Sequence, residues 1–372
     1  MTGFMAAALA SGLRARGRTS PNPAVGAVVV RDGAVVGEGW TQPPGGAHAE
    51  VMALENAGNA ARGAALFVTL EPCCVVGRTP PCTDAIIAAG VREVHFACPD
   101  PHPMVRGRGR QELERAGIAI FMGEDEATAR KHHEAFFHSV ATGRPFVIAK
   151  YAMTLDGRIA TAGGDSRWVS GEGSRRWVHR LRDAVDAIVV GVNTVLTDDP
   201  ELTARPAGVP AAARQPLRVI LDSTARCPAT ARLLRCPGRT LVACTADAPV
   251  ERLRELARAG AELLVLPSAD GRVALGPLMH LLGRRGVVSL LAEGGSAVLG
   301  AFLNGGYVNK VHAFVAPTIL GGAGLAPVSG RGQARMADAW RLRDPEWEGI
   351  GEDVLVTGYL DGRSGRATER RA

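Results

Sequence analysis

Residues 66–90 read LFVTLEPCCVVGRTPPCTDAIIAAG, a run that changes from β-rich to helical composition across proline-flanked cysteines. The apolar segment 66–70 predicts a short buried strand, and residues 85–89, with Gly90 after them, predict a helix and its stop signal. A strand that leads through a loop into a helix is the repeating unit of an α/β sheet. The segment therefore predicts an α/β fold, with Cys73 after a strand and Cys82 near the start of a helix.

The same alternation extends along the first part of the chain. Residues 24–30 and 34–37 flank Arg31-Asp32-Gly33 and predict a hairpin, because Asp-Gly supplies the positive dihedral angles of a tight turn. Helices are expected near the N-terminus and at 48–57, 111–116 and 124–141, and strands at 94–97 and 118–122. We predict a first domain over residues 1–144, with a largely parallel or mixed sheet flanked by helices.

The alternation restarts after Thr142-Gly143-Arg144-Pro145 and predicts a second α/β domain over residues 145–362. Its strand candidates are residues 146–152, 187–190, 217–221, 240–244, 262–266, 287–291 and 311–315. The Ala-, Pro- and Gly-rich residues 204–214 predict a surface loop, and the basic tail 363–372 is expected to be disordered.

Composition limits the classes of function. The formal charge of +6 is small for 372 residues and no basic face is evident, so a nucleic-acid partner is not expected. Seven unevenly spread cysteines do not form a secreted disulfide framework, which favours a reducing compartment. Without a charged leader or a spanning segment, we expect a cytoplasmic protein with no membrane partner.

A metal-binding pattern surrounds the opening segment. His48-Ala49-Glu50 precedes Pro72-Cys73 and Pro81-Cys82. One imidazole and two thiolates give zinc three protein ligands and leave a fourth position for water, as catalytic sites require. Glu50 could then carry a proton to a departing amine. Zinc deaminases combine His-x-Glu with Pro-Cys-x-x-Cys, although the second cysteine here comes six residues later.

Each part of this pattern also has a structural interpretation. A lone His-x-Glu at a helix start is usually a surface feature, and buried cysteines are commonly inert. Inert thiols are the expected role of Cys98, Cys227, Cys236 and Cys244. Cys74 adjoins Cys73 and is a rival ligand.

The second domain carries three polar, glycine-containing segments after predicted strands. They are residues 150–168, 191–205 and 292–296. Ligands bind α/β sheets beyond the carboxyl ends of strands, and the helix start at Gly294-Gly295-Ser296 suits a pyrophosphate. No Gly-x-Gly-x-x-Gly pattern opens the domain, so an ordinary Rossmann site is not expected. From the residues alone, a cofactor site and purely structural turns remain equal alternatives.

Both halves resemble the bifunctional deaminase-reductase family of riboflavin biosynthesis. The resemblance rests on Pro21-Asn22-Pro23, His48-Ala49-Glu50, Glu71-Pro72-Cys73, Gly77-Arg78-Thr79-Pro80-Pro81-Cys82, the 178–182 helix, Thr194-Val195 with Asp198-Asp199-Pro200, and Glu293-Gly294-Gly295. It implies a cytidine-deaminase-like three-layer domain followed by a dihydrofolate-reductase-like α/β domain. Two departures are Thr41, where the family often has histidine, and Cys74-Val75, where it has a Ser-His pair.

The resemblance also implies roles for individual residues. In the deaminase half, His48, Cys73 and Cys82 are the implied zinc ligands, Glu50 the proton donor and Asn22 a contact to the pyrimidine ring. The implied NADPH contacts are Ala152, Trp168, Thr194, Asp198 and Gly295. The implied substrate contacts are Ser166, Arg182, Leu202, Arg205 and Glu293, with Lys150 as a further candidate.

The implied function is a pair of consecutive reactions on a small phosphorylated pyrimidine in a homo-oligomeric enzyme. Zinc-dependent hydrolysis deaminates 2,5-diamino-6-(5-phosphoribosylamino)pyrimidin-4-one, and NADPH then reduces the ribosyl side chain of 5-amino-6-(5-phosphoribosylamino)uracil to ribityl. Two alternatives stay open at this point. One is a nucleobase or transfer-RNA deaminase whose second domain recruits substrate, and the other is a non-catalytic zinc-stabilised module fused to a reductase.

Overall fold

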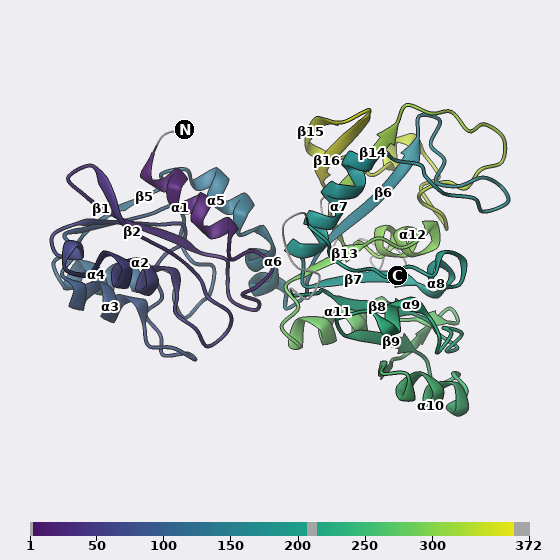
Figure 1. The fold of residues 1–372 in the computed structure, drawn as a ribbon, viewed down its shortest axis with the longest axis horizontal. Helices are drawn as coiled ribbons and strands as arrows, with labels where there is room; N and C mark the ends of the chain where they lie inside the picture. Colours follow the sequence, from purple (N-terminus) through teal and green to yellow (C-terminus); the bar gives the residue numbers. More distant parts are fainter. Residues whose placement is uncertain (1–2, 207–213, 361–372) are drawn as a thin grey trace, which may run out of the picture. The chain divides into compact units, whose positions relative to one another are not determined.

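The computed structural model describes residues 3–206 and 214–360. The chain divides into two compact units, residues 1–144 with 286–288 and residues 145–285 with 289–372. Each unit is described by itself (Figure 1). The basic tail expected at 363–372 and most of the loop expected at 204–214 lie outside the described residues.

The first unit contains a mixed five-stranded sheet in the order β2-β1-β3-β4-β5. β1 is antiparallel to β2 and β3, whereas β3, β4 and β5 run parallel. Asp32 and Gly33 have φ angles of 52° and 75°, which confirms the predicted tight hairpin turn. The elements are α1 (Phe4–Leu13), β1 (Gly26–Arg31), β2 (Ala34–Trp40), α2 (Ala49–Ala57), β3 (Ala65–Val68), α3 (Cys82–Ala89), β4 (Glu93–Phe96), α4 (Arg108–Arg115), β5 (Ala119–Met122), α5 (Glu126–His132) and α6 (Glu134–Thr142).

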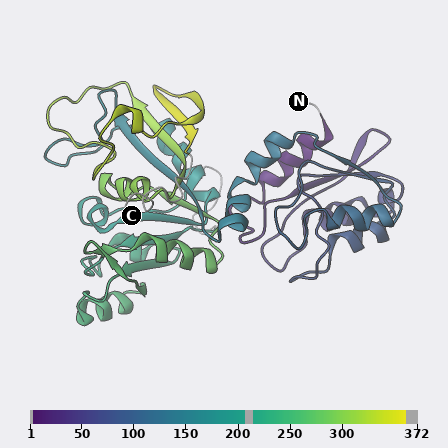
Figure 2. The ribbon, with the colours of Figure 1, turned by 180° about the vertical axis from the view of Figure 1, so that it is seen from behind.

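Helices cover both faces of this sheet. α1 and α5 lie on one side, and α2, α3 and α4 lie on the other, as the two opposite views show (Figures 1 and 2). The central strands are buried between these layers: Val28, Leu66 and Val94 are at most 1% exposed. The apolar runs read from the sequence are therefore core strands of a three-layer domain.

The single helix predicted at 124–141 is wrong. The structure has two helices, α5 and α6, separated at His133, whose φ and ψ angles are −98° and 10°. Local composition is helical throughout, so the break comes from tertiary contacts of the histidines at the junction.

The second unit contains a nine-stranded sheet in the order β10-β9-β8-β7-β13-β6-β14-β16-β15. The strands from β10 to β14 run parallel, and β16 and β15 extend the sheet antiparallel. Its larger elements are β6 (Phe146–Thr154), α7 (Glu172–Ala184), β7 (Ala187–Gly191), α8 (Val192–Asp198), β8 (Leu217–Leu221), α9 (Arg232–Arg235), β9 (Thr240–Cys244), α10 (Val250–Arg258), β10 (Glu262–Val265), α11 (Leu275–Arg284), β13 (Ser289–Ala292), α12 (Ser296–Asn304), β14 (Val308–Ala316), β15 (Arg343–Ile350) and β16 (Asp353–Tyr359). A two-stranded hairpin joins β11 (Ser268–Ala269) and β12 (Arg272–Val273).

Three details of this unit differ from the sequence prediction. The segment after Gly191, expected to be a turn, continues directly into α8, and the strand expected at 287–291 begins only at Ser289. β15 and β16 had no predicted counterpart. β15 is an edge strand whose residues are exposed except at its end, so it lacks a buried periodic face. No helix within the described ranges is both long and apolar enough to span a bilayer.

Arg218 on β8 is the largest fully buried side chain of the described residues. Its guanidinium donates to the carbonyl oxygens of Pro237 at 2.9 Å and Gly238 at 2.6 Å, and its Nε donates to Thr240 Oγ1 at 3.0 Å. A further bond of 3.4 Å reaches the Glu201 carbonyl. The arginine thus ties the 201–205 segment to the sheet.

We expect Arg218→Met to lower the free energy of unfolding by about 3 kcal/mol, because several buried acceptors lose their donors. Urea denaturation measures this change. Arg239→Met is the control: that side chain is 77% exposed and its loss should change stability by less than about 0.5 kcal/mol. Equal changes in the two variants would contradict the assigned role of Arg218.

Candidate functional site

His48, Cys73 and Cys82 converge in the first unit. His48 is the N-cap of α2, Cys82 is the first residue of α3, and Cys73 follows β3. His48 Nδ1 lies 3.1 Å from Cys82 Sγ and 3.5 Å from Cys73 Sγ, and the two sulfurs are 3.4 Å apart. Two helix N-termini and one strand end therefore bring three candidate ligand atoms together.

These atoms fit a zinc ion. Ligands bound to one tetrahedral zinc at 2.0–2.3 Å lie roughly 3.5–3.8 Å from one another, close to the separations of the three side chains. The hydrogen bond with Cys82 lowers the pKa of Cys73 to about 4, which favours the thiolate form that binds metal. Three protein ligands of this type leave one coordination position open.

Thr79 orients the histidine. Its Oγ1 lies 3.3 Å from His48 Nε2, on the side of the ring that faces away from the sulfurs. A partner on Nε2 fixes Nδ1 as the ligand atom. Thr79 belongs to the Gly77–Cys82 motif, three residues before Cys82, but no role for it was predicted from the sequence.

Glu50 is buried beside the cluster in the first turn of α2 and is 4% exposed. Burial, assisted by the Cys73 thiolate, raises the pKa of Glu50 to about 7. A carboxyl group with a pKa near neutrality can both take up and release a proton, as general acid/base catalysis requires.

The other residues singled out near this cluster have different surroundings. The Cys74 thiol donates to the Met104 carbonyl at 3.8 Å, and Cys74 is not one of the three converging residues. Thr41 is 3% exposed and its hydroxyl oxygen accepts from the Val25 amide at 3.1 Å. Asn22 lies between α1 and β1, where its backbone N–H donates to the Thr19 carbonyl oxygen at 2.8 Å.

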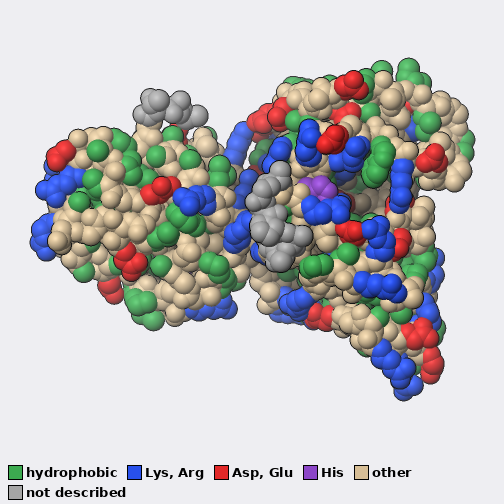
Figure 3. All heavy atoms as spheres, in the orientation of Figure 1, with side chains coloured by type: hydrophobic (Ala, Val, Ile, Leu, Met, Phe, Trp, Pro, Cys, Tyr) green, Lys and Arg blue, Asp and Glu red, His purple; other side chains and the backbone are tan. Residues whose placement is uncertain are grey.

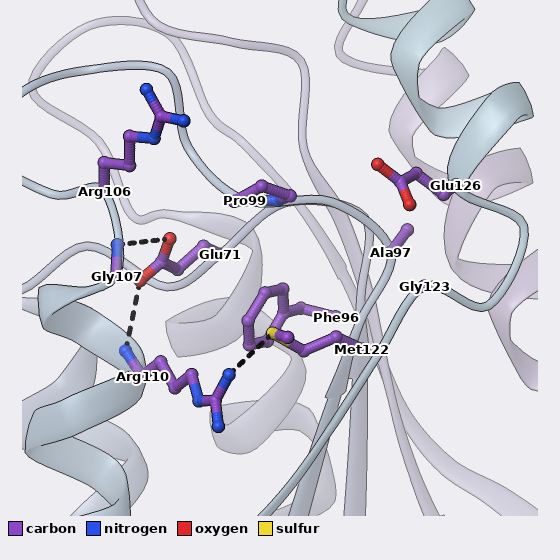
Figure 4. Close-up of a pocket in the computed structure, with 10 residues that line it drawn as sticks. All are labelled: Glu71, Phe96, Ala97, Pro99, Arg106, Gly107, Arg110, Met122, Gly123 and Glu126. Carbon is purple, nitrogen blue, oxygen red and sulfur yellow. Dashed lines mark hydrogen bonds between the residues drawn. The ribbon is translucent and has the colours of Figure 1, made fainter.

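Glu71 organises the loop that leads to Cys73. Its carboxylate accepts from the backbone amides of Asp100, Gly107 and Arg110 at 3.2, 3.0 and 3.1 Å. It also forms one wall of a cavity of about 450 Å³ (Figure 4). None of the three converging residues lines this cavity, whose walls are Glu71, Phe96, Ala97, Pro99, Arg106, Gly107, Arg110, Met122, Gly123 and Glu126. The glutamate of the Glu-Pro-Cys motif is therefore a structural support for the loop.

In the second unit, the segments expected to bind ligands follow the carboxyl ends of β6, β13 and β7, three neighbouring parallel strands. Ligands of open α/β sheets bind at such strand ends. Lys150 lies on β6, Glu293 follows β13, and Arg182 comes from α7.

Arg182 and Glu293 form a bidentate ion pair. Arg182 Nε lies 3.1 Å from both carboxylate oxygens and Nη2 lies 2.5 Å from Oε2, and the glutamate side chain is only 6% exposed. Burial raises the pKa of Glu293, but Arg182 and Lys150 outweigh it and the net shift is downward. Burial lowers the pKa of Lys150. The negative charge of Glu293 raises that pKa but does not outweigh burial. The Glu293 carboxylate is therefore a counter-charge to two partly buried cations.

The start of α12 fits the phosphates of a dinucleotide. Its N-cap is Gly295, which has no side chain to occupy the amides of the first turn. If Gly295 were replaced by alanine, the new Cβ would lie 3.8 Å from Thr194 Oγ1, in ordinary contact. If Gly294 were replaced, the new Cβ would clash with the Val298 Cβ at 2.6 Å. The two glycines therefore keep this helix start open next to Thr194.

The remaining predicted residues lie on three segments. Arg167 Nη2 donates to the Asp198 carbonyl at 2.8 Å, which joins the Ser166–Trp168 loop to the end of α8. Trp168 is 72% exposed and stacks with Arg175. Arg205 forms an ion pair with Glu201, and Leu202 between them is buried with a φ of 52°. Arg167 was not predicted as a site residue.

Ala152 lies on β6. It packs against a small apolar cluster formed by Val178, Phe314 and Leu355.

Comparisons with known proteins cover both units. The cytidine and deoxycytidylate deaminase zinc-binding region matches residues 2–98, and the RibD C-terminal domain matches residues 145–356. The riboflavin biosynthesis protein RibD of Escherichia coli K12 is 39% identical over 362 residues, with 95% of this chain and 97% of that protein covered. RibD of Aquifex aeolicus is 40% identical over 353 residues, covering 95% and 96%.

Solved structures agree. Acinetobacter baumannii RibD, form 1, has a TM-score of 0.86 and 36% identity, covering 96% of this chain and 98% of that one. The diaminohydroxyphosphoribosylaminopyrimidine deaminase/5-amino-6-(5-phosphoribosylamino)uracil reductase of Thermotoga maritima has a TM-score of 0.83 and 35% identity, with the same coverage. These matches confirm the predicted fold class and set aside the two alternative functions. The chain belongs to the RibD family of bifunctional deaminase-reductases of riboflavin biosynthesis.

Proposed function

We propose that the first unit deaminates 2,5-diamino-6-(5-phosphoribosylamino)pyrimidin-4-one and that the second unit reduces the ribosyl side chain of 5-amino-6-(5-phosphoribosylamino)uracil. The observation that carries this assignment is the presence of two different polar clusters in one chain. His48, Cys73 and Cys82 converge beside Glu50 in one unit, and Lys150, Arg182 and Glu293 meet at strand ends in the other.

In the deaminase unit, His48 Nδ1 and the sulfurs of Cys73 and Cys82 hold zinc. When bound, zinc acts as a Lewis acid that makes water nucleophilic near neutral pH. Glu50 removes a proton from the attacking water and delivers it to the departing amino group, and its burial keeps competing solvent away from this transfer. Thr79 holds the imidazole in the orientation that directs Nδ1 to the metal. Asn22 contacts the pyrimidine ring.

In the reductase unit, NADPH supplies the hydride. The open start of α12 and Thr194 would hold its phosphates, and Gly295 leaves room there because it has no side chain. The other proposed cofactor contacts are Ala152, Trp168 and Asp198. Arg182, Lys150 and Glu293 position the substrate, because their fixed charges orient its polar groups before reaction. Ser166, Leu202 and Arg205 complete the proposed substrate contacts.

The metal assignment predicts the result of zinc removal. We expect purified protein to contain about one zinc per chain, and dialysis against a chelator to abolish ammonia release, since the proposed nucleophile is a water molecule activated by zinc. NADPH-dependent reduction of the pre-deaminated intermediate should remain. Metal analysis and the two assays measure these outcomes, and zinc addition is the control. Reduction lost in parallel with zinc would contradict a deaminase-only role for the metal.

Location and assembly also stay predictions. A cytoplasmic location is supported by the seven cysteines, all of which lie in the described residues and are free of disulfides there. Assembly into a homo-oligomer is proposed from the family resemblance alone. On the face shown in Figure 3, acidic side chains are interspersed among basic ones, which does not favour a nucleic-acid partner.

A further inference from the structure

Two adjacent histidines at the α5–α6 junction each contact a different loop of the deaminase unit. His132 Nε2 lies 2.6 Å from the Ala24 carbonyl oxygen, and His133 Nε2 lies 3.1 Å from Thr69 Oγ1. Ala24 closely follows Asn22, and Thr69 shortly precedes Cys73. The two imidazole rings meet edge to face with centroids 4.7 Å apart. One rigid junction therefore contacts both loops.

Burial of His133 is unfavourable for the free energy of folding. It is 2% exposed, and its Nδ1 has no hydrogen-bond partner among the described residues. A buried polar atom without a partner costs about 1–3 kcal/mol. Burial also lowers the pKa of His133 well below its ordinary value, which favours the neutral ring. A phenyl ring would fill the same space without an unpartnered polar atom. We therefore infer that the bond between His133 and Thr69 serves function and does not chiefly stabilise the fold.

Thr69 connects the α5–α6 junction to the loop that carries Cys73, because it is bonded to His133 and lies four residues before Cys73. It is fully buried, its Oγ1 accepts from the Gly26 amide at 3.2 Å, and its own amide donates to the Gly26 carbonyl at 3.0 Å. It stands directly after β3, so its placement sets where the chain leaves the sheet toward Cys73. A displacement at Thr69 would move the Cys73 sulfur relative to His48 and Cys82.

We propose that His133, acting through Thr69, is a positioning residue that sets the geometry of the zinc site, while His132 fixes the neighbouring Asn22 loop. The inference rests on the proposed ligand role of Cys73. It explains why α5 and α6 are separate helices: the break at His133 lets successive side chains reach loops from two different strands.

The test is His133→Phe in the full chain, with zinc affinity measured by competition with a chelating dye. We expect affinity to fall about tenfold, as for other residues that orient metal ligands indirectly. The kcat for deamination should fall more than KM changes, and the visible spectrum of the cobalt-loaded protein should shift. The thermal midpoint of the metal-free protein should be unchanged or higher. His133→Gln, whose amide nitrogen can reach Thr69, should restore the affinity to within about threefold of the original protein.

His95→Phe is the matched control. The His95 ring stacks between Phe67 and Phe121 at 4.2 and 4.6 Å, so the substitution changes a packed histidine of the same unit without touching Thr69. It should leave zinc affinity and the cobalt spectrum unchanged. Unaltered affinity in His133→Phe would overturn the proposal, as would an affinity loss matched by destabilisation of the metal-free protein. A cobalt spectrum of the original protein without thiolate charge-transfer bands would instead reject the Cys73–Cys82 ligand set itself.

Discussion

Glu50→Gln should lower the kcat for ammonia release by about 10³–10⁴, at the upper end of the contribution of general acid/base catalysis. Glutamine keeps the size and shape of the buried side chain but cannot take up a proton from water. Because Glu50 lies in a different unit from Lys150, Arg182 and Glu293, NADPH oxidation with the pre-deaminated intermediate should stay within about twofold of the original rate. Zinc content should also be unchanged.

The comparison requires a control on the same helix. Glu55→Gln on α2 changes an exposed carboxylate and should leave both reactions as they are. Separate assays of ammonia release and NADPH oxidation distinguish the sites. If folded Glu50→Gln protein loses both activities equally, the assignment of the two reactions to two separate sites is wrong.

Glu293→Gln should lower kcat/KM for the reduction by about 10²–10³, which corresponds to about 2.7–4 kcal/mol. The substitution removes the carboxylate that accepts three hydrogen bonds from Arg182 and leaves the partly buried Arg182 and Lys150 without this counter-charge. The free energy of unfolding of the second unit should fall by about 3 kcal/mol for the same reason. Deamination should be unaffected.

A double substitution separates stability from function. Adding Lys150→Met to Glu293→Gln removes one of the uncompensated cations and should recover part of the lost stability without recovering reduction. Glu172→Gln on α7 is the surface control, since that carboxylate is 71% exposed and pairs with Arg176 on the same helix. Full reductase activity in Glu293→Gln would exclude the ion pair from the reductase site.

The fold was predictable where burial leaves a periodic trace in the sequence. β8 and β9 have the predicted bounds because most of their residues are apolar, although β8 also contains the buried Arg218. The hairpin around Asp32-Gly33 follows from turn chemistry. β15 was not predictable, since an exposed edge strand carries no such trace. The interruption between α5 and α6 at His133 could not be predicted from the sequence either, because contacts with loops far away in sequence override a locally helical composition.

The candidate sites divide in the same way. His48, Cys73 and Cys82 could be proposed together because zinc chemistry restricts the residue types, and the family resemblance accounts for the nine-residue spacing of the two cysteines. The supporting residues could not. The Arg182–Glu293 pair joins residues 111 positions apart, and the His133–Thr69 bond spans 64 positions. Such pairs depend on which strand ends become neighbours, and that is decided by the whole sheet.

The most direct test of the account is to supply the diamino pyrimidine phosphate to the intact protein and follow ammonia and NADPH together. We predict one ammonia released per substrate whether or not NADPH is present, and one NADPH oxidised per substrate only after ammonia has been released. This order follows if zinc and Glu50 act first and the Lys150–Arg182–Glu293 cluster acts on the product. Ammonia release that requires NADPH, or NADPH oxidation that precedes it, would contradict two consecutive reactions at separate sites.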